Sequence, residues 1–384
     1  MEPAEFHCHT RVLFGPGVVA QLEPIARQFG FRRSLVVADR GVAACGYVDQ
    51  VGELLSKAGA EGFHFQDFHS NPDSDMIESG RAFAALLAVD SIIGLGGGSS
   101  MDCARAINFV LTNGGHIQDY EGYGKAQRPL LPMIGIPTTS GTGSEAQSYA
   151  LISHAKTHVK MACGDPKAAF QVALLDPVLT LSQPAEVTAA TGFDAIAHAV
   201  ETFTSTRRSP FSEPFSRHAW RLLESNFERV LQSPDDLEAR GAMQLGAHFA
   251  GIAIENSMLG ATHACANPLT ARYDTTHGVA IALLLPSVVR WNRAAAAQQY
   301  VELESYRAAR VSERPISATN DPTETLARRL EQLAAAGNFP SRAPAVPKED
   351  LPALARQAAE QWTARFNPRP FDAAGALEIY ECVF

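Results

Sequence analysis

The chain has 384 residues, of which 46% are hydrophobic, and it carries a formal net charge of −9 with a pI of about 5.7. A single hydrophobic core stops growing near ~250–300 residues, so this length predicts two domains. The acidic balance argues against nucleic acid or an anionic membrane as the main partner.

Cysteine usage and the N-terminal sequence indicate the compartment. Six cysteines lie far apart and form no CxxC pair, which argues against a disulfide framework or a structural zinc site and favours reduced thiols. The first ten residues, MEPAEFHCHT, are acidic and polar, unlike a signal peptide. The longest notable apolar run, Val279 to Leu285, is far shorter than a membrane span. We therefore expect a cytoplasmic protein.

The first half of the chain alternates short apolar runs with helix-like stretches. This alternation is typical of a mostly parallel sheet with helices on both faces. The apolar runs are Ser34–Ala38, Val89–Leu95, Leu131–Ile136 and Val172–Leu175, and the helix-like stretches include Val51–Ala58 and Gly80–Leu87. We expect an α/β domain over residues 1–180.

A glycine-rich turn follows one of these runs. The strand-like segment from Ser91 enters Gly96, Gly97 and Gly98, and a helix-compatible stretch, Met101 to Val110, leaves them. Backbone N–H groups at a helix N-terminus favour a pyrophosphate. The turn fits the dinucleotide fingerprint only loosely, because Ser99 stands where a third glycine is usual, and it is not a Walker loop.

A second turn of this kind follows the apolar run that ends at Ile136. It reads PTTSGTGSE, from Pro137 to Glu145, and holds five hydroxyl residues and two glycines. Such a turn can bind phosphate and ribose oxygens. The alternative is a structural loop whose hydroxyls cap their own backbone.

The alternation stops after Pro184, and the remaining sequence is helical in character. Four apolar residues spaced 3-4-3 predict a buried helix face rather than a binding surface: Phe193, Ile196, Val200 and Phe203. Further alanine-rich segments predict helices around Ala247–Ala266, Ala294–Arg310, Thr323–Ala336 and Leu351–Ala364. The segments Val311–Asp321 and Gly337–Pro347 look like surface connections. We expect an all-α domain over residues 181–384.

Four side chains of this second half form a candidate metal site. Asp194 and His198 stand four residues apart, so on a helix both project from one face. His263 and His277 would complete the site, and Gly278 would let the backbone turn closely past an ion. One carboxylate and three imidazoles suit Fe(II) or Zn(II). The alternative is an ordinary surface pair and core histidines.

Together these segments resemble the iron-dependent (group III) alcohol dehydrogenase family, whose fold is shared with glycerol dehydrogenase and dehydroquinate synthase. The resemblance covers nearly the whole chain and includes both glycine-rich turns, with Arg105 where a lysine is usual. Its other segments are Phe14-Gly15-Pro16-Gly17, Val36-Val37-Ala38-Asp39, Asn71-Pro72, Leu174-Leu175-Asp176-Pro177 and Asn367-Pro368-Arg369.

The resemblance implies an NAD-binding first domain and a metal-binding, catalytic second domain. The implied cofactor contacts are Asp39, Asn71, Gly97, Gly98, Ser99, Asp102, Thr138, Thr139, Thr142, Ser144, Lys160 and Leu179. The implied metal ligands are Asp194, His198, His263 and His277, with Fe(II) the expected ion and Zn(II) the alternative. A carboxylate at Asp39 would accept hydrogen bonds from the ribose 2′-OH and repel a 2′-phosphate, so we expect NAD rather than NADP.

The chain departs from the family at one position. The family's HxxxH pattern begins at His263, but the fourth residue on is Asn267. The missing histidine is often assigned to proton transfer or substrate contact, and asparagine has no proton that titrates near neutral pH. We expect Asn267 and His277 to take part in catalysis. The alternative is that Asn267 satisfies a helix end before Pro268.

The predicted protein is an NAD- and metal-dependent oxidoreductase of a small alcohol or aldehyde, with its active site between the domains and a homo-oligomeric state, a dimer or larger. Within the same fold, a dehydroquinate synthase-like lyase would need a basic pocket, and Arg272 is the only Lys or Arg between Gly251 and Val289. A maleylacetate reductase-like or other oxo-acid reductase would need only one or two distant arginines. A catalytically silent nucleotide- or metal-binding protein is the alternative from another class.

Overall fold

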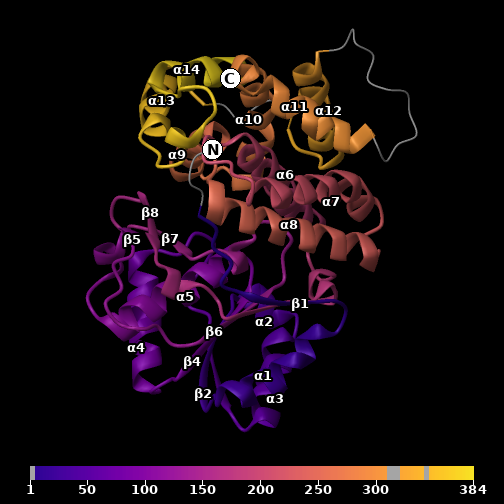
Figure 1. Ribbon diagram of the computed structural model, residues 1–384. Helices are drawn as coiled ribbons and strands as arrows, with labels where there is room; N and C mark the ends of the chain where they lie inside the picture. Colours follow the sequence, from indigo (N-terminus) through magenta and orange to yellow (C-terminus); the bar gives the residue numbers. More distant parts are fainter. Residues whose placement is uncertain (1–4, 309–320, 341–345) are drawn as a thin grey trace. The chain divides into compact units, whose positions relative to one another are not determined.

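The computed structural model describes residues 5–308, 321–340 and 346–384 (Figure 1). The described chain forms two compact units. One is Cys8–Gln183, and the other is Pro184–Phe384 together with the N-terminal residues up to His7.

The first unit is built on a six-stranded parallel sheet, as predicted. Its strand order is β1-β9-β6-β4-β2-β3, and every pairing is parallel. In that order the strands are Arg11–Phe14, Val172–Leu175, Met133–Pro137, Ser91–Gly96, Arg33–Val37 and Glu61–Phe65. The carboxyl ends of β4 and β6 lead directly into the two glycine-rich turns. The α/β fold class predicted from the alternating pattern is thus confirmed.

Helices cover both faces of this sheet because successive strand residues point to opposite sides. Leu35 packs in one apolar core and Val36 in the other. Helices α4 (Ser74–Leu86) and α5 (Gly98–Asn113) contribute to the first core. Helices α1 (Leu22–Phe29) and α3 (Tyr47–Ala58) contribute to the second, and the short α2 spans Arg40–Ala44.

A small second sheet was not predicted. It has the order β5-β8-β7, with β5 at Gly122–Tyr123, β8 at Lys160–Gly164 and β7 at Tyr149–Ser153. β7 and β8 are antiparallel. β7 begins shortly after the second glycine-rich turn, and β8 begins at Lys160, so this sheet positions one predicted cofactor residue.

The second unit is helical, in agreement with the prediction (Figure 1). Its central helix is α6 (Ala185–Thr204), which packs against α7, α8 and α10 and is buried along most of its length. The predicted apolar stripe from Phe193 to Phe203 lies wholly in the core. The other helices are α7 Glu213–Gln232, α8 Leu237–Ser257, α9 Ala261–Tyr273, α10 His277–Trp291, α11 Arg293–Ala308, α12 Pro322–Ala336, α13 Leu351–Ala359 and α14 Ala373–Val383.

Seven short 3-10 helices complete the described elements. They are η1 Val18–Gln21, η2 Ile117–Tyr120, η3 Ser144–Ala146, η4 Pro166–Ala168, η5 Pro177–Thr180, η6 Lys348–Asp350 and η7 Ala364–Phe366. Asp176 joins two of them, since its buried carboxylate accepts hydrogen bonds from the backbone N–H groups of Gly17, Val19 and Val178. This carboxylate ties the opening turn of the chain to the end of the sheet.

Two helix predictions need correction. The segment around Ala247–Ala266 is not one helix, because the chain breaks between α8 and α9 with Met258 in the left-handed region at φ 72°. The helix expected up to Ala364 ends at Ala359, and a 3-10 turn follows. Of the two expected connections, all of Val311–Asp321 except Asp321, and residues 341–345 of Gly337–Pro347, lie outside the described residues.

Within the described residues, no single helix combines the length and apolar composition needed to cross a membrane. Helices α10 and α11 meet that test only as a pair, with a bend of 110° between them. The six cysteines are free thiols, and those at positions 103, 163 and 265 are buried.

Candidate metal centre and nucleotide site

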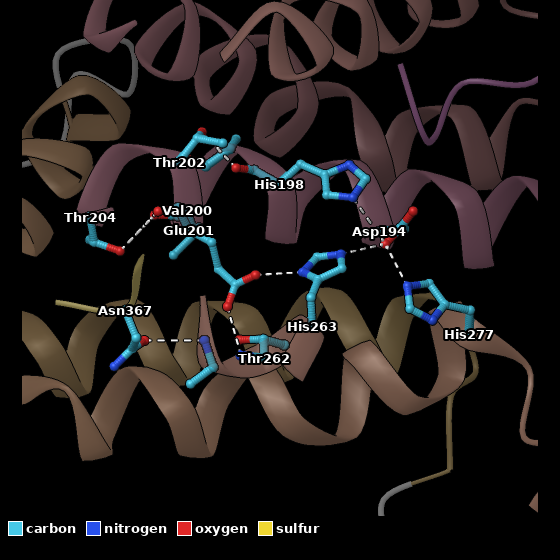
Figure 2. Close-up of polar contacts among 12 residues, drawn as sticks. Asp194, His198, Val200, Glu201, Thr202, Thr204, Thr262, His263, His277 and Asn367 are labelled. Atoms are coloured by element: carbon cyan, nitrogen blue, oxygen red, sulfur yellow. Dashed lines mark hydrogen bonds and ion pairs between the residues drawn. The ribbon is translucent and has the colours of Figure 1, made fainter. Parts of the chain in front are cut away.

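The central helix α6 carries three ionisable side chains on one face. Asp194, His198 and Glu201 follow the spacing i, i+4, i+7, and each residue is only 5% exposed. Ionisable groups in a core are stable only when hydrogen bonds or opposite charges compensate their lost hydration. Their partners come from the starts of two other helices (Figure 2).

The metal-site prediction places four side chains together, and the structure does bring them together. His263 lies in the first turn of α9, and His277 is the first residue of α10. The Nε2 atoms of His198, His263 and His277 lie 3.5, 3.3 and 3.6 Å from Asp194 Oδ1. The donor atoms of Asp194, His263 and His277 all lie within 4.8 Å of one another, and His198 joins them through Asp194.

These separations fit a shared ion better than a hydrogen-bonded cluster. N–H···O bonds have N···O distances near 2.9 Å, and three nitrogens converge here on one oxygen at longer distances. Ligands about 2.0–2.2 Å from a tetrahedral ion are separated by about 3.4 Å. Three imidazoles and a carboxylate thus form a donor set that fits Fe(II) or Zn(II).

Gly278 brings α10 close to α6, which is a different role from the one predicted. A Cβ atom at this position would lie 2.3 Å from the backbone carbonyl oxygen of Ala190 on α6. Only glycine permits this approach of the two backbones. The close contact places His277, the adjacent residue, beside Asp194.

Charge compensation within the cluster is visible in the pKa values. Burial would raise the pKa of Asp194, but His198 and the other two histidines outweigh it and hold that pKa well below its usual range. Burial would lower the pKa of His263, but Glu201 and Asp194 outweigh it and raise that pKa to about 9. A proton on His263 thus balances the carboxylates, and a metal ion that bound this imidazole would have to displace it.

Glu201 is a residue that the sequence reasoning missed. Its Oε2 lies 2.5 Å from His263 Nδ1, the ring nitrogen that faces away from Asp194. The signal was available in the sequence, because Glu201 lies seven residues after Asp194 and so on the same face of the helix.

The two glycine-rich turns of the first unit pack against each other. A Cβ atom at Gly97 would lie 3.2 Å from Thr139 Cγ2, and one at Gly98 would lie 2.8 Å from Thr142 Cγ2. The Thr138 N–H donates to the carbonyl of Gly96. Side chains at these glycines would therefore push the two turns apart. The turns lie roughly 40 residues apart in the sequence, so local structure alone cannot bring them together.

This arrangement fits a dinucleotide. Helix α5 begins at Gly98, and its N-cap residue, Gly97, provides no side-chain cap, so N–H groups of the first turn are left for an anion. The Ser140 hydroxyl in the second turn is buried and has no hydrogen-bond partner in the described part of the chain. Both features fit phosphate and ribose oxygens.

Comparison with known proteins identifies the family. A model of the iron-containing alcohol dehydrogenases matches residues 9–177, and a model of the C-terminal region of the same family matches residues 188–384. The chain belongs to the iron-containing alcohol dehydrogenase family. The resemblance read from the sequence is thus confirmed.

Individual relatives align with this chain over nearly its whole length. NAD-dependent methanol dehydrogenase of Bacillus methanolicus is 30% identical over 359 residues, 93% of each chain. 1,3-Propanediol dehydrogenase of Citrobacter freundii is 31% identical over 97% of this chain and 96% of its own. The structure of an alcohol dehydrogenase from Oenococcus oeni superposes with a TM-score of 0.94 at 30% identity and 100% coverage of both chains. This chain is accordingly an NAD-dependent oxidoreductase of the alcohol dehydrogenase type.

Arg105, which replaces the family's usual lysine, fastens the second turn of this alcohol dehydrogenase. It is fully buried and stacks over the Phe170 ring at 4.4 Å. Its guanidinium donates to Ser144 Oγ at 2.8 Å and to the Gln147 carbonyl at 2.7 Å, and it also contacts the Ser144 carbonyl. A lysine has fewer donors and no planar fork, so it would hold this loop less completely.

Several predicted cofactor residues gather around this turn. The Asn71 N–H donates to Ser99 Oγ at 3.4 Å, and Lys160 Nζ donates to Asn71 Oδ1 at 3.5 Å. Ser144 Oγ donates to Asp102 Oδ1 at 3.0 Å. Two other predicted cofactor residues, Asp39 and Leu179, lie away from this turn. Asp39 follows β2 and caps α2 by accepting a hydrogen bond from the Val42 N–H, and Leu179 is 2% exposed in the core, so only its backbone is available.

Asn267 lies within α9 rather than at a helix end. The helix continues through Pro268 to Tyr273, so the helix-end explanation is wrong. The Asn267 side-chain amide donates to Gln361 Oε1 at 3.0 Å. Arg272, on the same helix, pairs with Asp350 at 2.6 Å.

Asp102 gives a testable pH dependence. Burial raises its pKa to about 6, despite Arg105 and Lys160, whose charges oppose the shift. The unfolded pKa is about 3.9, so the folded state binds this proton more tightly and stability falls as pH rises from about 4 to about 6. We expect Asp102→Asn to gain up to about 3 kcal/mol relative to the native chain between pH 4 and pH 7.5. Urea unfolding followed by circular dichroism at both pH values checks this, and a constant difference would contradict it.

Proposed function

We propose that this alcohol dehydrogenase transfers a hydride between NAD(H) and a small alcohol or aldehyde at a divalent metal ion held by Asp194, His198, His263 and His277. The observation that carries the proposal is the convergence of three Nε2 atoms on Asp194 Oδ1 at 3.3–3.6 Å. Fe(II) is the expected ion, and Zn(II) suits the same donors. The methanol and 1,3-propanediol named for two relatives support a small substrate.

The protein's part is to hold charges and orient groups. When bound, the metal ion supplies Lewis acidity toward a substrate oxygen, and the nicotinamide carries the hydride. Asp194 would offset part of the ion's charge, and its burial would strengthen that interaction. The His277 side chain is 30% exposed, against 5–8% for the other three, so the cluster is accessible to a small molecule from this side.

The alternatives receive less support. An oxo-acid reductase or a dehydroquinate synthase-like lyase needs a cation for its substrate's acidic groups. Arg272, the basic residue nearest in sequence to the histidines, is engaged by Asp350. A catalytically silent nucleotide- or metal-binding protein could use the same four ligands, but it would have no need of the partly exposed His277, which makes the cluster accessible to a small molecule.

We also infer a homo-oligomer in the cytoplasm. Strand β1 forms one edge of the six-stranded sheet, and its Val12 and Phe14 are 37% and 46% exposed. An exposed apolar edge strand is a template for pairing with a second copy. Six free thiols suit a reducing compartment.

The metal ligands are tested by truncation. We expect Asp194→Ala and His263→Ala to lose the bound metal and to reduce kcat by roughly 10³-fold or more, since Lewis acidity contributes several kcal/mol. Metal content by mass spectrometry, activity and circular dichroism are measured together. His218→Ala, which removes an exposed histidine from α7, is the matched control. Full activity in a metal-stripped enzyme would contradict the proposal.

Cofactor choice is tested at Asp39. Asp39→Asn keeps an oxygen that can cap α2 but removes the charge, so the local fold is preserved. We expect the ratio of kcat/KM for NADP over NAD to rise at least about tenfold, because one like-charge repulsion near a surface is worth about 1–4 kcal/mol. A native enzyme that prefers NADP, or an unchanged ratio, would show that Asp39 does not meet the ribose.

The proton path is tested at Asn267. We expect the native pH profile of kcat/KM to lack a histidine titration near ~6–7, and Asn267→His to introduce one. Gln361→Leu, which removes the amide's partner without adding a titrating group, controls for altered packing. Identical profiles for the native enzyme and Asn267→His would mean that this position lies outside the proton path.

A further inference from the structure

Glu201 connects the metal centre to the start of α9. Its carboxylate is buried, and its two oxygens face different groups on that helix (Figure 2). Oε1 accepts a hydrogen bond from the Thr262 backbone N–H at 2.6 Å. Oε2 lies 2.5 Å from Nδ1 of His263. One side chain of α6 thus contacts both the backbone and a candidate ligand of α9.

The start of α9 depends on this contact because the helix has no cap of its own. Its N-cap residue is Gly260, which offers no side chain to the first-turn N–H groups. Asn367 Oδ1 accepts a hydrogen bond from the Ala261 N–H at 3.2 Å, and Glu201 accepts one from the Thr262 N–H. A Cβ atom at Gly260 would lie 3.0 Å from Asn367 Oδ1 and 3.2 Å from Glu201 Oε1. Glycine therefore leaves room for two capping groups from distant parts of the chain, and the Glu201 charge suits the positive end of the helix dipole.

The same carboxylate sets the tautomer of His263. A carboxylate can only accept, so the imidazole must carry its proton on Nδ1 toward Glu201. In the neutral imidazole, which is the form that binds a metal, the lone pair of Nε2 would then lie on the Asp194 side, where an ion would bind. A carboxylate partner also increases the basicity of the ligating nitrogen. A buried carboxylate is costly unless paired, and these two contacts are what compensate Glu201.

We propose that Glu201 is the positioning residue of the metal centre, which fixes the tautomer and orientation of His263 while it caps the helix that carries this ligand. The inference rests on the proposed metal site, but it concerns a residue that lies one contact beyond the ion. It predicts that metal affinity depends on Glu201 even though Glu201 binds no metal.

The decisive variant is Glu201→Gln, which keeps the size of the side chain but leaves one oxygen for two donors. Its NH2 group must face either the Thr262 N–H or His263 Nδ1. We expect the dissociation constant for Co(II), titrated into the metal-free full chain, to rise about 10–100-fold, as for other partners of metal-bound histidines. The visible absorption bands of the Co(II) protein, which report ligand geometry, should shift as well.

Two further variants make the test specific. Thr204→Val removes the buried hydrogen bonds from the Thr204 hydroxyl to the backbone carbonyls of Val200 and Glu201. It leaves the Glu201 carboxylate and the histidines untouched, so its Co(II) affinity should stay within about twofold of native. Glu201→Asp keeps the negative charge on a shorter side chain, so its Co(II) affinity should lie between those of the native protein and Glu201→Gln. Circular dichroism of each metal-free protein establishes that it is folded, and if Glu201→Gln fails to fold, Glu201→Asp carries the comparison.

The outcomes separate this inference from the proposed function. A native chain that binds no Co(II) would overturn the metal centre and the inference with it. Native-like affinity and spectrum in Glu201→Gln would overturn the positioning role and leave the metal centre standing. An equal loss of affinity in Thr204→Val would also overturn it, because general loosening of α6 would then be sufficient.

Discussion

The structure of the helical unit is governed by the need to compensate ionisable groups on a buried helix. Helix α6 packs against α7, α8 and α10, yet it carries Asp194, His198 and Glu201. An unpaired charge in such a place costs several kcal/mol, so partners must arrive at fixed positions. The partners are His263 and His277, and each lies at the beginning of its helix. A divalent ion would complete the compensation, which links the stability of this region to metal binding.

The C-terminal segment extends this arrangement beyond the ligands. Asn367 caps α9 and exchanges amide hydrogen bonds with Asn292, the C-cap residue of α10. Arg369 lies over the Trp291 ring at 3.8 Å and donates to the Trp291 carbonyl. The Asn-Pro-Arg tripeptide thus contacts the start of the helix that carries His263 and the end of the helix that carries His277. These contacts give the Asn-Pro-Arg tripeptide a physical role, whereas its sequence indicated only a resemblance to the family.

The first unit brings two turns together with glycine and holds the loop that follows with arginine. Two turns must approach each other closely, and Gly97 and Gly98 provide the space that Thr139 and Thr142 occupy. The loop that follows is held by the guanidinium of Arg105, which is buried and satisfied by Ser144, Gln147 and the Phe170 ring. A loop held by these contacts would lose less conformational entropy when a cofactor binds.

Periodicity and local spacing determined much of this protein from the sequence. The alternating apolar runs indicated the parallel sheet, the stripe from Phe193 to Phe203 indicated a core helix, and the four-residue spacing of Asp194 and His198 indicated half of the histidine–carboxylate cluster. These features depend on 2.0- and 3.6-residue repeats, which neighbouring residues encode. Tertiary structure decided which distant residues meet. In the helical unit it brought Glu201 to His263, brought Gly278 against Ala190 and formed the hydrogen bond from Asn267 to Gln361. In the first unit it supplied the partners of Arg105. Each of these joins residues that are distant in the chain, and no local repeat encodes which of them will meet once the helices and strands have packed.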